Sequence, residues 1–236
     1  MNIGILLAGG TGTRLGTEIP KQYIKAGGRA VMTYSLECLC RHEKIDAVQI
    51  VAEPAWRAQI TEWLLKYDPG RKFRGFCAPG QTRQLSVFYA LKEIKNYAEA
   101  EDCVLIHDAA RPLLSAEQVT ECLAAVREGH DGALPVLPMK DTVYQSRDKK
   151  TVSCLLERKE IFAGQAPEAF RFGKYYEANR RLFPEQIYGI NGSTEPAVLA
   201  GMDILMIPGD EENFKITTKA DLDRFCRILQ ERDGIL

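Results

Sequence analysis

Residues 1–22 read MNIGILLAGGTGTRLGTEIPKQ, and this stretch indicates both a fold class and a kind of ligand. The apolar run at residues 3–7 predicts a short buried strand. A glycine-rich loop follows, and then the cations Arg14 and Lys21. Glycine lets the backbone come close to an anion, and consecutive N–H groups can point at it. The two cations would add fixed positive charge. We interpret the stretch as a strand that leads into a phosphate-binding loop.

The loop departs from two common phosphate-binding motifs. No Gly-Lys-Ser/Thr closes it, so it is not a P-loop, and it lacks the G-x-G-x-x-G of a dinucleotide fingerprint. A tight strand-to-helix turn with solvated charges would use the same residue types. The pairing of Arg14 with Lys21 behind the glycines is what favours nucleotide binding.

Length and composition limit the function classes. The chain has 236 residues and a formal net charge of −1. That length suits one large α/β domain or two small ones, and the lack of a linker or repeat favours a single domain over residues 1–236. The balanced charge gives no pull toward nucleic acid or membrane. Seven cysteines without C-x-x-C spacing are typical of reduced thiols. With no leader or membrane span in the sequence, we expect a cytoplasmic protein.

Short apolar segments alternate with helical patterns along most of the chain. This alternation predicts an α/β fold with a Rossmann-like, doubly wound and mainly parallel sheet. Strands are expected at residues 3–7, 47–52, 73–78, 103–107, 133–137 and 204–207. Helices are expected at residues 30–42, 54–67, 82–94, 115–126, 173–182 and 219–232.

Three polar clusters follow three of these strands. They are the glycine loop, residues 80–86 and residues 107–112. Ligands of such sheets bind beyond the carboxyl ends of the strands. We therefore expect the three clusters to converge on one site.

Residues 140–156 interrupt the alternation and read as an inserted β-hairpin, which defines an arm at about residues 139–158. A hairpin of this size needs something to pack on. It could pack on a partner subunit, or it could be a plain surface excursion.

Asp108 follows an apolar strand and precedes Arg111. An aspartate there could hold Mg²⁺ against nucleotide phosphates or could simply cap a turn. The cations Arg14, Lys21, Arg111 and Lys215 could neutralise a polyphosphate or could be solvated surface charges. Together these residues fit nucleotidyl transfer, which depends on positioning and charge neutralisation rather than covalent catalysis.

Five motifs carry a more specific resemblance. LAGGTGTRLGTEIPKQY, GQTRQLSV, IHDAARP, KDTV and NFKITTKADL occur in this order along the chain. Their order and spacing resemble the IspD/TarI cytidylyltransferase family over nearly the whole sequence. The resemblance implies an Mg²⁺-dependent enzyme that transfers CMP from CTP to a polyol phosphate. It also implies a homodimer that forms through the β-arm.

The resemblance implies a role for each matching position. Arg14, Lys21 and Lys215 would stabilise charge at the α-phosphate, and Asp108 would hold Mg²⁺. Arg111, Thr142 and Arg158 would contact the polyol phosphate, with Thr142 and Arg158 serving a site shared between subunits. The CTP phosphates would be wrapped by Ala8, Gly9, Gly10, Thr11, Gly12 and Thr13, and the cytosine and ribose would be read by Gly80, Gln81 and Ser86.

The part of the sequence that the resemblance assigns to the acceptor, called here the acceptor half, departs from the family pattern. Ala166-Pro167-Glu168 stands where Thr-Pro-Gln is usual, and Asn191-Gly192 stands where Thr-Asp is usual. Either Ser193 and Thr194 substitute for the missing groups, or the acceptor differs. His107-Asp108-Ala109-Ala110 favours 2-C-methyl-D-erythritol 4-phosphate as acceptor, whereas the segment at residues 7–13 is more like the ribitol-5-phosphate branch. The glycine loop would also suit a sugar-phosphate nucleotidylyltransferase, and the acceptor-half departures would suit a non-catalytic nucleotide-binding subunit.

Overall fold

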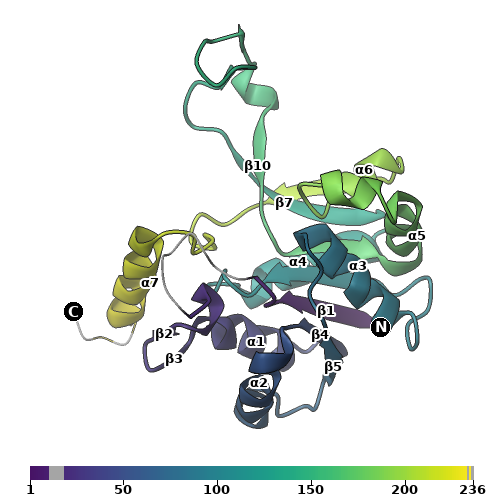
Figure 1. Cartoon of the computed structure of the whole chain (residues 1–236), viewed down its shortest axis with the longest axis vertical. Coiled ribbons are helices and arrows are strands. Elements are labelled where there is room, and N and C mark those ends of the chain that lie inside the picture. The colour runs from purple at the N-terminus through teal and green to yellow at the C-terminus, as the bar shows by residue number, and fades with distance from the viewer. Residues whose placement is uncertain (11–18, 233, 235–236) are drawn as a thin grey trace.

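The chain folds around one twisted sheet, seen in a computed structural model that describes residues 1–10, 19–232 and 234. Figure 1 shows the sheet with helices on both sides. The strand order is β10-β7-β11-β6-β1-β4-β5, and β12 pairs with β7. The strands are β1 (Asn2–Leu7), β4 (Ala47–Val51), β5 (Phe73–Cys77), β6 (Cys103–Asp108), β7 (Gly132–Pro138), β10 (Phe162–Gly164), β11 (Glu168–Arg171) and β12 (Ile204–Pro208).

The predicted parallel core of the sheet is confirmed. Strand β1 pairs in parallel with β4 on one side and with β6 on the other, and β5 continues the parallel order beyond β4. Strand β11 was not predicted, and it lies antiparallel between β6 and β7. This insertion brings Glu168, the first residue of β11, opposite Ile106 near the carboxyl end of β6.

Two layers of helices cover the sheet, because its strands bury side chains on both faces. Helices α1 (Val31–Arg41), α2 (Pro54–Tyr67) and α4 (Ala116–Arg127) pack on the face that includes Leu6. Helices α3 (Arg83–Ile94), α5 (Phe172–Leu182) and α6 (Glu195–Leu199) pack on the face that includes Ile3 and Ile5. The alternation along β1 is the period of two expected for a strand with two buried faces.

Local sequence explains where several helices begin. Thr82 Oγ1 accepts a hydrogen bond from the Leu85 N–H at 3.1 Å and caps α3. Ser115 caps α4 in the same way, since its Oγ accepts from the Gln118 N–H at 3.1 Å. At the last helix, α7 (Lys219–Arg232), the Asp221 carboxylate accepts from the Thr218 N–H at 2.8 Å. These contacts confirm the predicted starts of α4 and α7.

The remaining elements are short. They are the pair β2 (Lys25–Ala26) and β3 (Arg29–Ala30), and the 3-10 turns η2 (Lys21–Tyr23), η3 (Arg158–Glu160) and η4 (Gln186–Gly189). Within the described residues, no helix combines the length and apolar character that crossing a bilayer requires.

The predicted hairpin is present as an arm that projects from the body in Figure 1. It contains β8 (Tyr144–Gln145) and β9 (Cys154–Leu155), which pair antiparallel. At its tip, Asp148 Oδ1 accepts hydrogen bonds from the N–H groups of Lys150 and Thr151, at 2.9 and 2.8 Å. The arm exposes three apolar side chains to solvent, Tyr144, Val152 and Leu155.

Candidate active site

The described residues of the three predicted polar clusters converge at the carboxyl edge of β1, β5 and β6. They line a cavity of about 460 Å³. Gly9 and Gly80 reach it from different loops, and Pro79 lies so close to Gly9 that a Cβ there would sit 2.3 Å from the Pro79 Cβ. The other predicted residues on the wall are Gly10, Lys21, Gln81, Ser86, Asp108 and Lys215.

The start of the glycine loop is fixed by two side chains of η2. Gln22 Nε2 donates hydrogen bonds to the carbonyls of Ala8 and Gly10, each at 2.7 Å. The Tyr23 hydroxyl donates to the Ala8 carbonyl at 2.9 Å. Sequence reasoning did not assign this role to Gln22 and Tyr23. The predicted residues Thr11, Gly12, Thr13 and Arg14 lie outside the described residues.

The turn before α3 has a defined shape. The Gly80 N–H donates to Ser86 Oγ at 2.9 Å, and Ser86 Oγ donates to the Thr82 carbonyl at 2.9 Å. A Cβ on Gly80 would lie 2.6 Å from Leu85 Cγ, so the turn needs glycine for close packing. Gly80, Gln81 and Ser86 are thereby presented together on one wall of the cavity.

Asp108, the last residue of β6, is the electrostatic centre of the site. Its Oδ2 accepts from Lys215 Nζ at 2.8 Å, and its Oδ1 accepts from Arg83 Nε at 2.9 Å. Arg111 Nε lies 3.8 Å from Oδ2. Burial alone would raise the pKa of the Asp108 carboxyl, but Arg83 and Lys215 outweigh it and hold the pKa well below its usual range. Asp108 is therefore a fixed negative charge among three cations.

A second cavity, of about 300 Å³, adjoins the first. Arg83, Asp108 and Lys215 line both cavities. The second cavity is otherwise lined by Arg111, Leu134, Gly164, Gln165, Ala166, Glu168 and residues 191–195. The two spaces thus share one charged wall, so ligands in the two cavities would lie next to each other at that wall.

The segment that carries Lys215 is anchored through Asn213. The fully buried Asn213 Nδ2 donates to Gln118 Oε1 at 2.8 Å and to the Ala166 carbonyl at 2.9 Å. Arg111 Nη1 donates to the Asn213 carbonyl at 2.6 Å. These bonds join the ends of β6 and β10 to the Lys215 loop, so Arg111 and Lys215 are held beside the same carboxylate.

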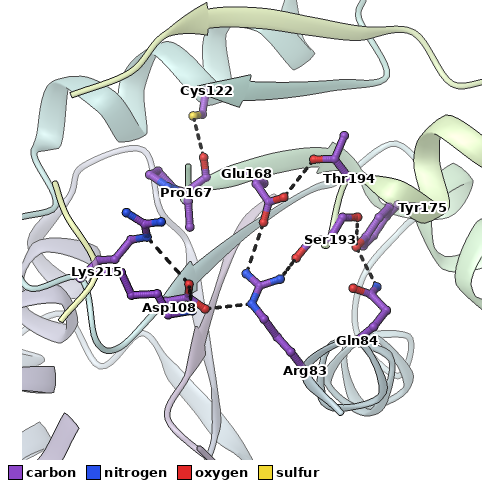
Figure 2. A network of polar contacts seen from close by, with 12 residues as sticks. Arg83, Gln84, Asp108, Cys122, Pro167, Glu168, Tyr175, Ser193, Thr194 and Lys215 are labelled. Carbon is purple, nitrogen blue, oxygen red and sulfur yellow. Dashed lines mark hydrogen bonds and ion pairs between the residues drawn. The ribbon is translucent and has the colours of Figure 1, made fainter. Parts of the chain in front are cut away.

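Ser193 and Thr194, the candidate substitutes in the acceptor half, are both engaged within the protein. Arg83 Nη1 donates to Ser193 Oγ, and the Tyr175 hydroxyl donates to the Ser193 carbonyl at 2.7 Å. Thr194 Oγ1 donates to Glu168 Oε1 at 2.9 Å. Figure 2 shows these contacts on the far side of Arg83 from Asp108. The two hydroxyls therefore organise the wall of the second cavity.

Comparison with known proteins places this geometry in a family. Residues 3–231 match the family model described as IspD: 2-C-methyl-D-erythritol 4-phosphate cytidylyltransferase. The chain belongs to the IspD cytidylyltransferase family. It is accordingly an enzyme of the nucleotidyltransferase class, as the sequence motifs predicted.

Individual relatives include both branches of that family. The chain is 31% identical over 238 residues to a 2-C-methyl-D-erythritol 4-phosphate cytidylyltransferase of Stenotrophomonas maltophilia, covering 98% of this chain and 97% of the relative. It is 29% identical over 238 residues to a ribitol-5-phosphate cytidylyltransferase of Streptococcus agalactiae, covering 99% and 98%. Among solved structures, the 4-diphosphocytidyl-2C-methyl-D-erythritol synthase of Anaerococcus prevotii superposes with a TM-score of 0.83 at 25% identity, covering 98% and 96%.

Two predicted residues of the IspD-family site lie away from the cavities of this chain. Thr142 and Arg158 are exposed on the arm. Arg158 Nη1 donates to the Lys140 carbonyl at 2.8 Å, a contact within the arm itself. The single chain places Lys21, Asp108, Arg111 and Lys215 on the walls of the two adjoining cavities, and neither cavity is lined by Thr142 or Arg158.

As a single carboxylate, Asp108 would hold a metal ion only together with oxygen atoms of a bound substrate. The described residues contain no group of three or more His, Cys, Asp or Glu side chains that could hold a metal ion. Mg²⁺ is commonly bound by one or two carboxylates together with substrate phosphates. One buried carboxylate at the junction of two cavities fits an ion that arrives with a triphosphate.

Arg83 and Glu168 are site residues that sequence reasoning missed. Arg83 lies inside a predicted helix, where an arginine is usually solvated, and Glu168 was noted only as a departure from the family pattern. Arg83 Nη2 lies 3.3 Å from Glu168 Oε2, so Arg83 links the Asp108 centre to the second cavity. The polar stretch before α3 was the available signal, because a helix start at the carboxyl edge of a sheet faces the ligand site.

Proposed function

We propose that this protein transfers CMP from CTP to a polyol phosphate, most directly 2-C-methyl-D-erythritol 4-phosphate, and releases pyrophosphate. The observation that carries the proposal is the position of Asp108, between Lys215 and Arg83, on the wall shared by the two cavities. The first cavity, lined by Lys21 and Ser86, would take the nucleotide, and we call it the nucleotide cavity. The second cavity, lined by Arg111 and Glu168, would take the acceptor, and we call it the acceptor cavity. The reacting phosphates would then meet beside the charged wall.

The proposed reaction is an in-line displacement. An oxygen of the acceptor phosphate forms a bond to the α-phosphorus of CTP. The bond from that phosphorus to the bridging oxygen breaks, and pyrophosphate leaves with the electron pair. Negative charge spreads over the phosphate oxygens, so cations near the α-phosphate lower the barrier. Lys21 and Lys215 line the nucleotide cavity and are assigned this role together with Arg14.

The nucleotide would be held from two sides. Residues 8–13 are assigned to the phosphates, and the turn of Gly80, Gln81 and Ser86 is assigned to the cytosine and ribose. Asp108, together with triphosphate oxygens, is assigned to Mg²⁺. The ion would supply further neutralisation of phosphate charge.

The acceptor phosphate is assigned to Arg111, which lines the second cavity. Thr142 and Arg158 are assigned to the same substrate but from the arm of a second subunit. The active unit would then be a homodimer of single-domain chains, acting in the cytoplasm. The exposed apolar residues of the arm support this arrangement, because clustered exposed apolar side chains mark interaction sites.

Nucleotide selectivity tests the proposal. CTP should raise the midpoint of thermal unfolding more than UTP, GTP or ATP at equal concentration with Mg²⁺, because a ligand stabilises the folded state according to its affinity. A UTP shift equal to or larger than the CTP shift would instead support a sugar-phosphate nucleotidylyltransferase.

Ribitol 5-phosphate is the second candidate acceptor. The observation that favours it is the 29% identity to the Streptococcus agalactiae ribitol-5-phosphate cytidylyltransferase over 99% of this chain. Turnover with ribitol 5-phosphate and none with 2-C-methyl-D-erythritol 4-phosphate would assign the protein to the synthesis of a precursor of a cell-surface polymer.

A further inference from the structure

Arg83, the first residue of α3, contacts three elements at once. Its Nε donates to Asp108 Oδ1 at 2.9 Å, at the end of β6. Its Nη2 lies 3.3 Å from Glu168 Oε2, at the start of β11, and its Nη1 donates to Ser193 Oγ, just before α6. Figure 2 shows these partners on different sides of the guanidinium. One side chain therefore joins β6, β11 and residues 191–195, which line the acceptor cavity and are called here the acceptor wall.

A second route from α3 reaches the acceptor wall at the same residue. The fully buried Ser193 accepts a hydrogen bond at its carbonyl from the Tyr175 hydroxyl, at 2.7 Å. Gln84 Nε2 donates to that hydroxyl at 3.1 Å. Gln84 directly follows Arg83, so the first turn of α3 holds Ser193 both directly and through Tyr175.

The same turn lines the nucleotide cavity, where Thr82, Arg83 and Ser86 form part of the wall. Ser86 Oγ donates to the Thr82 carbonyl at 2.9 Å and keeps the turn closed. The start of α3 is therefore common to both cavities, and Arg83 ties it to the acceptor wall.

The three contacts of Arg83 depend on the shape of its guanidinium. Nε, Nη1 and Nη2 donate in different directions within one plane, whereas a lysine carries a single ammonium. A lysine at this position would keep its charge near Asp108 and Glu168 but would not bridge to Ser193 as well. Thr194 Oγ1 would still donate to Glu168 Oε1, at 2.9 Å, so the acceptor wall would loosen rather than come away.

We infer that Arg83 is a positioning residue for the acceptor, which holds the acceptor wall in place beside Asp108 through the shape of its guanidinium and not through its charge alone. The inference rests on the proposed function and adds a residue to the same site. A transfer reaction needs its two substrates in a fixed relative position. A loosened acceptor wall should therefore weaken acceptor binding and slow the transfer, while CTP binding is largely kept.

Arg83→Lys is the informative variant, because it keeps the charge and loses the fork. Kinetics of pyrophosphate release with CTP, Mg²⁺ and the polyol phosphate that the wild-type protein turns over fastest should show the acceptor KM raised about tenfold and kcat lowered about tenfold. The KM for CTP should stay within about threefold. Arg29→Lys is the matched control and should change none of these quantities. The Arg29 side chain is 27% exposed, close to the 29% of Arg83, and pairs with Glu37 away from both cavities.

Ser193→Ala tests the same contact from the other side and removes only a hydroxyl. It should raise the acceptor KM about threefold on its own, and less than about twofold further in the Arg83→Lys protein, where the contact is already lost. Effects of the two substitutions that multiply in full would show that Arg83 does not act through Ser193. That result, or an unchanged acceptor KM in Ser193→Ala, overturns the inference.

Amide hydrogen exchange reports on the acceptor wall without turnover. The Glu195 N–H donates to the Gly192 carbonyl at 3.2 Å, and the Val198 N–H donates to the Thr194 carbonyl at 3.0 Å. In Arg83→Lys these amides should exchange about tenfold faster, with exchange in α2 unchanged. Faster exchange throughout the chain would make Arg83 a general structural residue and would overturn the inference.

The outcomes separate this inference from the proposed function. If the wild-type protein turns over no polyol phosphate, the proposed function fails, and hydrogen exchange still decides whether Arg83 holds the acceptor wall. If the wild-type protein is active but Arg83→Lys matches it in acceptor KM and in exchange, the inference alone fails. An equal rise in the KM values for CTP and for the acceptor also overturns it.

Discussion

Asp108 shows how one residue can define a site through its neighbours. Its carboxylate is buried, and burial of a charge is costly unless cations surround it. Lys215 and Arg83 meet that requirement at 2.8 and 2.9 Å. Because the same cations face the two cavities, the contacts that keep Asp108 ionised also create the positive surface that a phosphate needs.

Lys215 should matter far more for turnover than for folding. Lys215→Ala removes a cation from the nucleotide cavity, and we expect kcat to fall at least about 100-fold. Asp108 keeps Arg83, so the free energy of unfolding should fall by only about 1–2 kcal/mol. Steady-state kinetics and urea denaturation measure the two effects.

The control for this variant is Lys174→Ala, because Lys174 forms a similar ion pair with Asp131 away from both cavities. It should leave kcat unchanged. Equal losses of activity and stability in Lys215→Ala would make Lys215 a structural residue.

His107 should make the protein less stable in mild acid. Complete burial lowers its pKa to about 4, despite a hydrogen bond from Nε2 to the Arg111 carbonyl at 2.9 Å. The folded pKa lies below the unfolded value of about 6.5, so the stabilising contribution is complete above that pH and is lost as the pH falls toward 4. The full loss is about 3 kcal/mol.

Urea denaturation between pH 4 and 7 measures this loss. His107→Gln can retain the hydrogen bond to Arg111 but cannot titrate, so its stability should fall less over that range than the wild-type stability. Parallel curves for the two proteins would exclude His107 as the source of the pH dependence.

The residues of the site could be predicted from the sequence only where a motif also implied a role for the residue. Asp108 and Lys215 follow recognisable patterns, and the structure brings them within hydrogen-bonding distance. Arg83 and Gln22 lie inside two of the motifs, but no role was predicted for either, since an arginine in a helix and a glutamine beside a lysine are usually solvated. Their roles depend on partners at Glu168 and Ala8, which are far away in the chain or reached through a turn.

At the scale of elements, prediction succeeded where the sequence pattern is local. Helix α2 was predicted with its observed bounds, and the predicted capping residues Ser115 and Asp221 start α4 and α7. Strand β11 was missed because it has four residues, directly after Pro167, and no alternating pattern. Its place between β6 and β7 is set by tertiary pairing, which single-sequence periodicity does not encode.

The arm is the element that the proposed dimer depends on. Two paired residues per strand are too few to hold a free hairpin, so the arm needs a surface to pack on, and the proposed dimer supplies it. Deletion of residues 145–151 removes the tip of the arm and should therefore shift the protein toward monomers in sedimentation experiments. The midpoint of thermal unfolding of the body should change little, since the arm projects away from the core.

A point variant provides a finer test of the arm. Leu155→Asp places a charge on the exposed arm, where Leu155 is 64% exposed, and should weaken dimerisation. Leu65→Asp on α2 is the matched control, because Leu65 is 86% exposed on the body and should have no effect. An unchanged dimer after both the deletion and Leu155→Asp would remove the arm from the interface.

At the scale of the whole molecule, the sheet explains why distant motifs form one site. Parallel strands end at a common edge, so the loops after β1, β5 and β6 meet there although they are far apart in the sequence. The antiparallel insertion of β11 adds Glu168 and the acceptor cavity to the same edge. The nucleotide half follows from the predicted topology, whereas the acceptor half depends on the unpredicted strand.

Pyrophosphate release with CTP and Mg²⁺ tests the central claim most directly. It should be measured in parallel on 2-C-methyl-D-erythritol 4-phosphate, ribitol 5-phosphate and a panel of further polyol and sugar phosphates. We predict CTP-dependent release with a polyol phosphate, led by 2-C-methyl-D-erythritol 4-phosphate, and none without an acceptor. No release with any polyol phosphate, from protein that is folded and binds CTP, would contradict the claim.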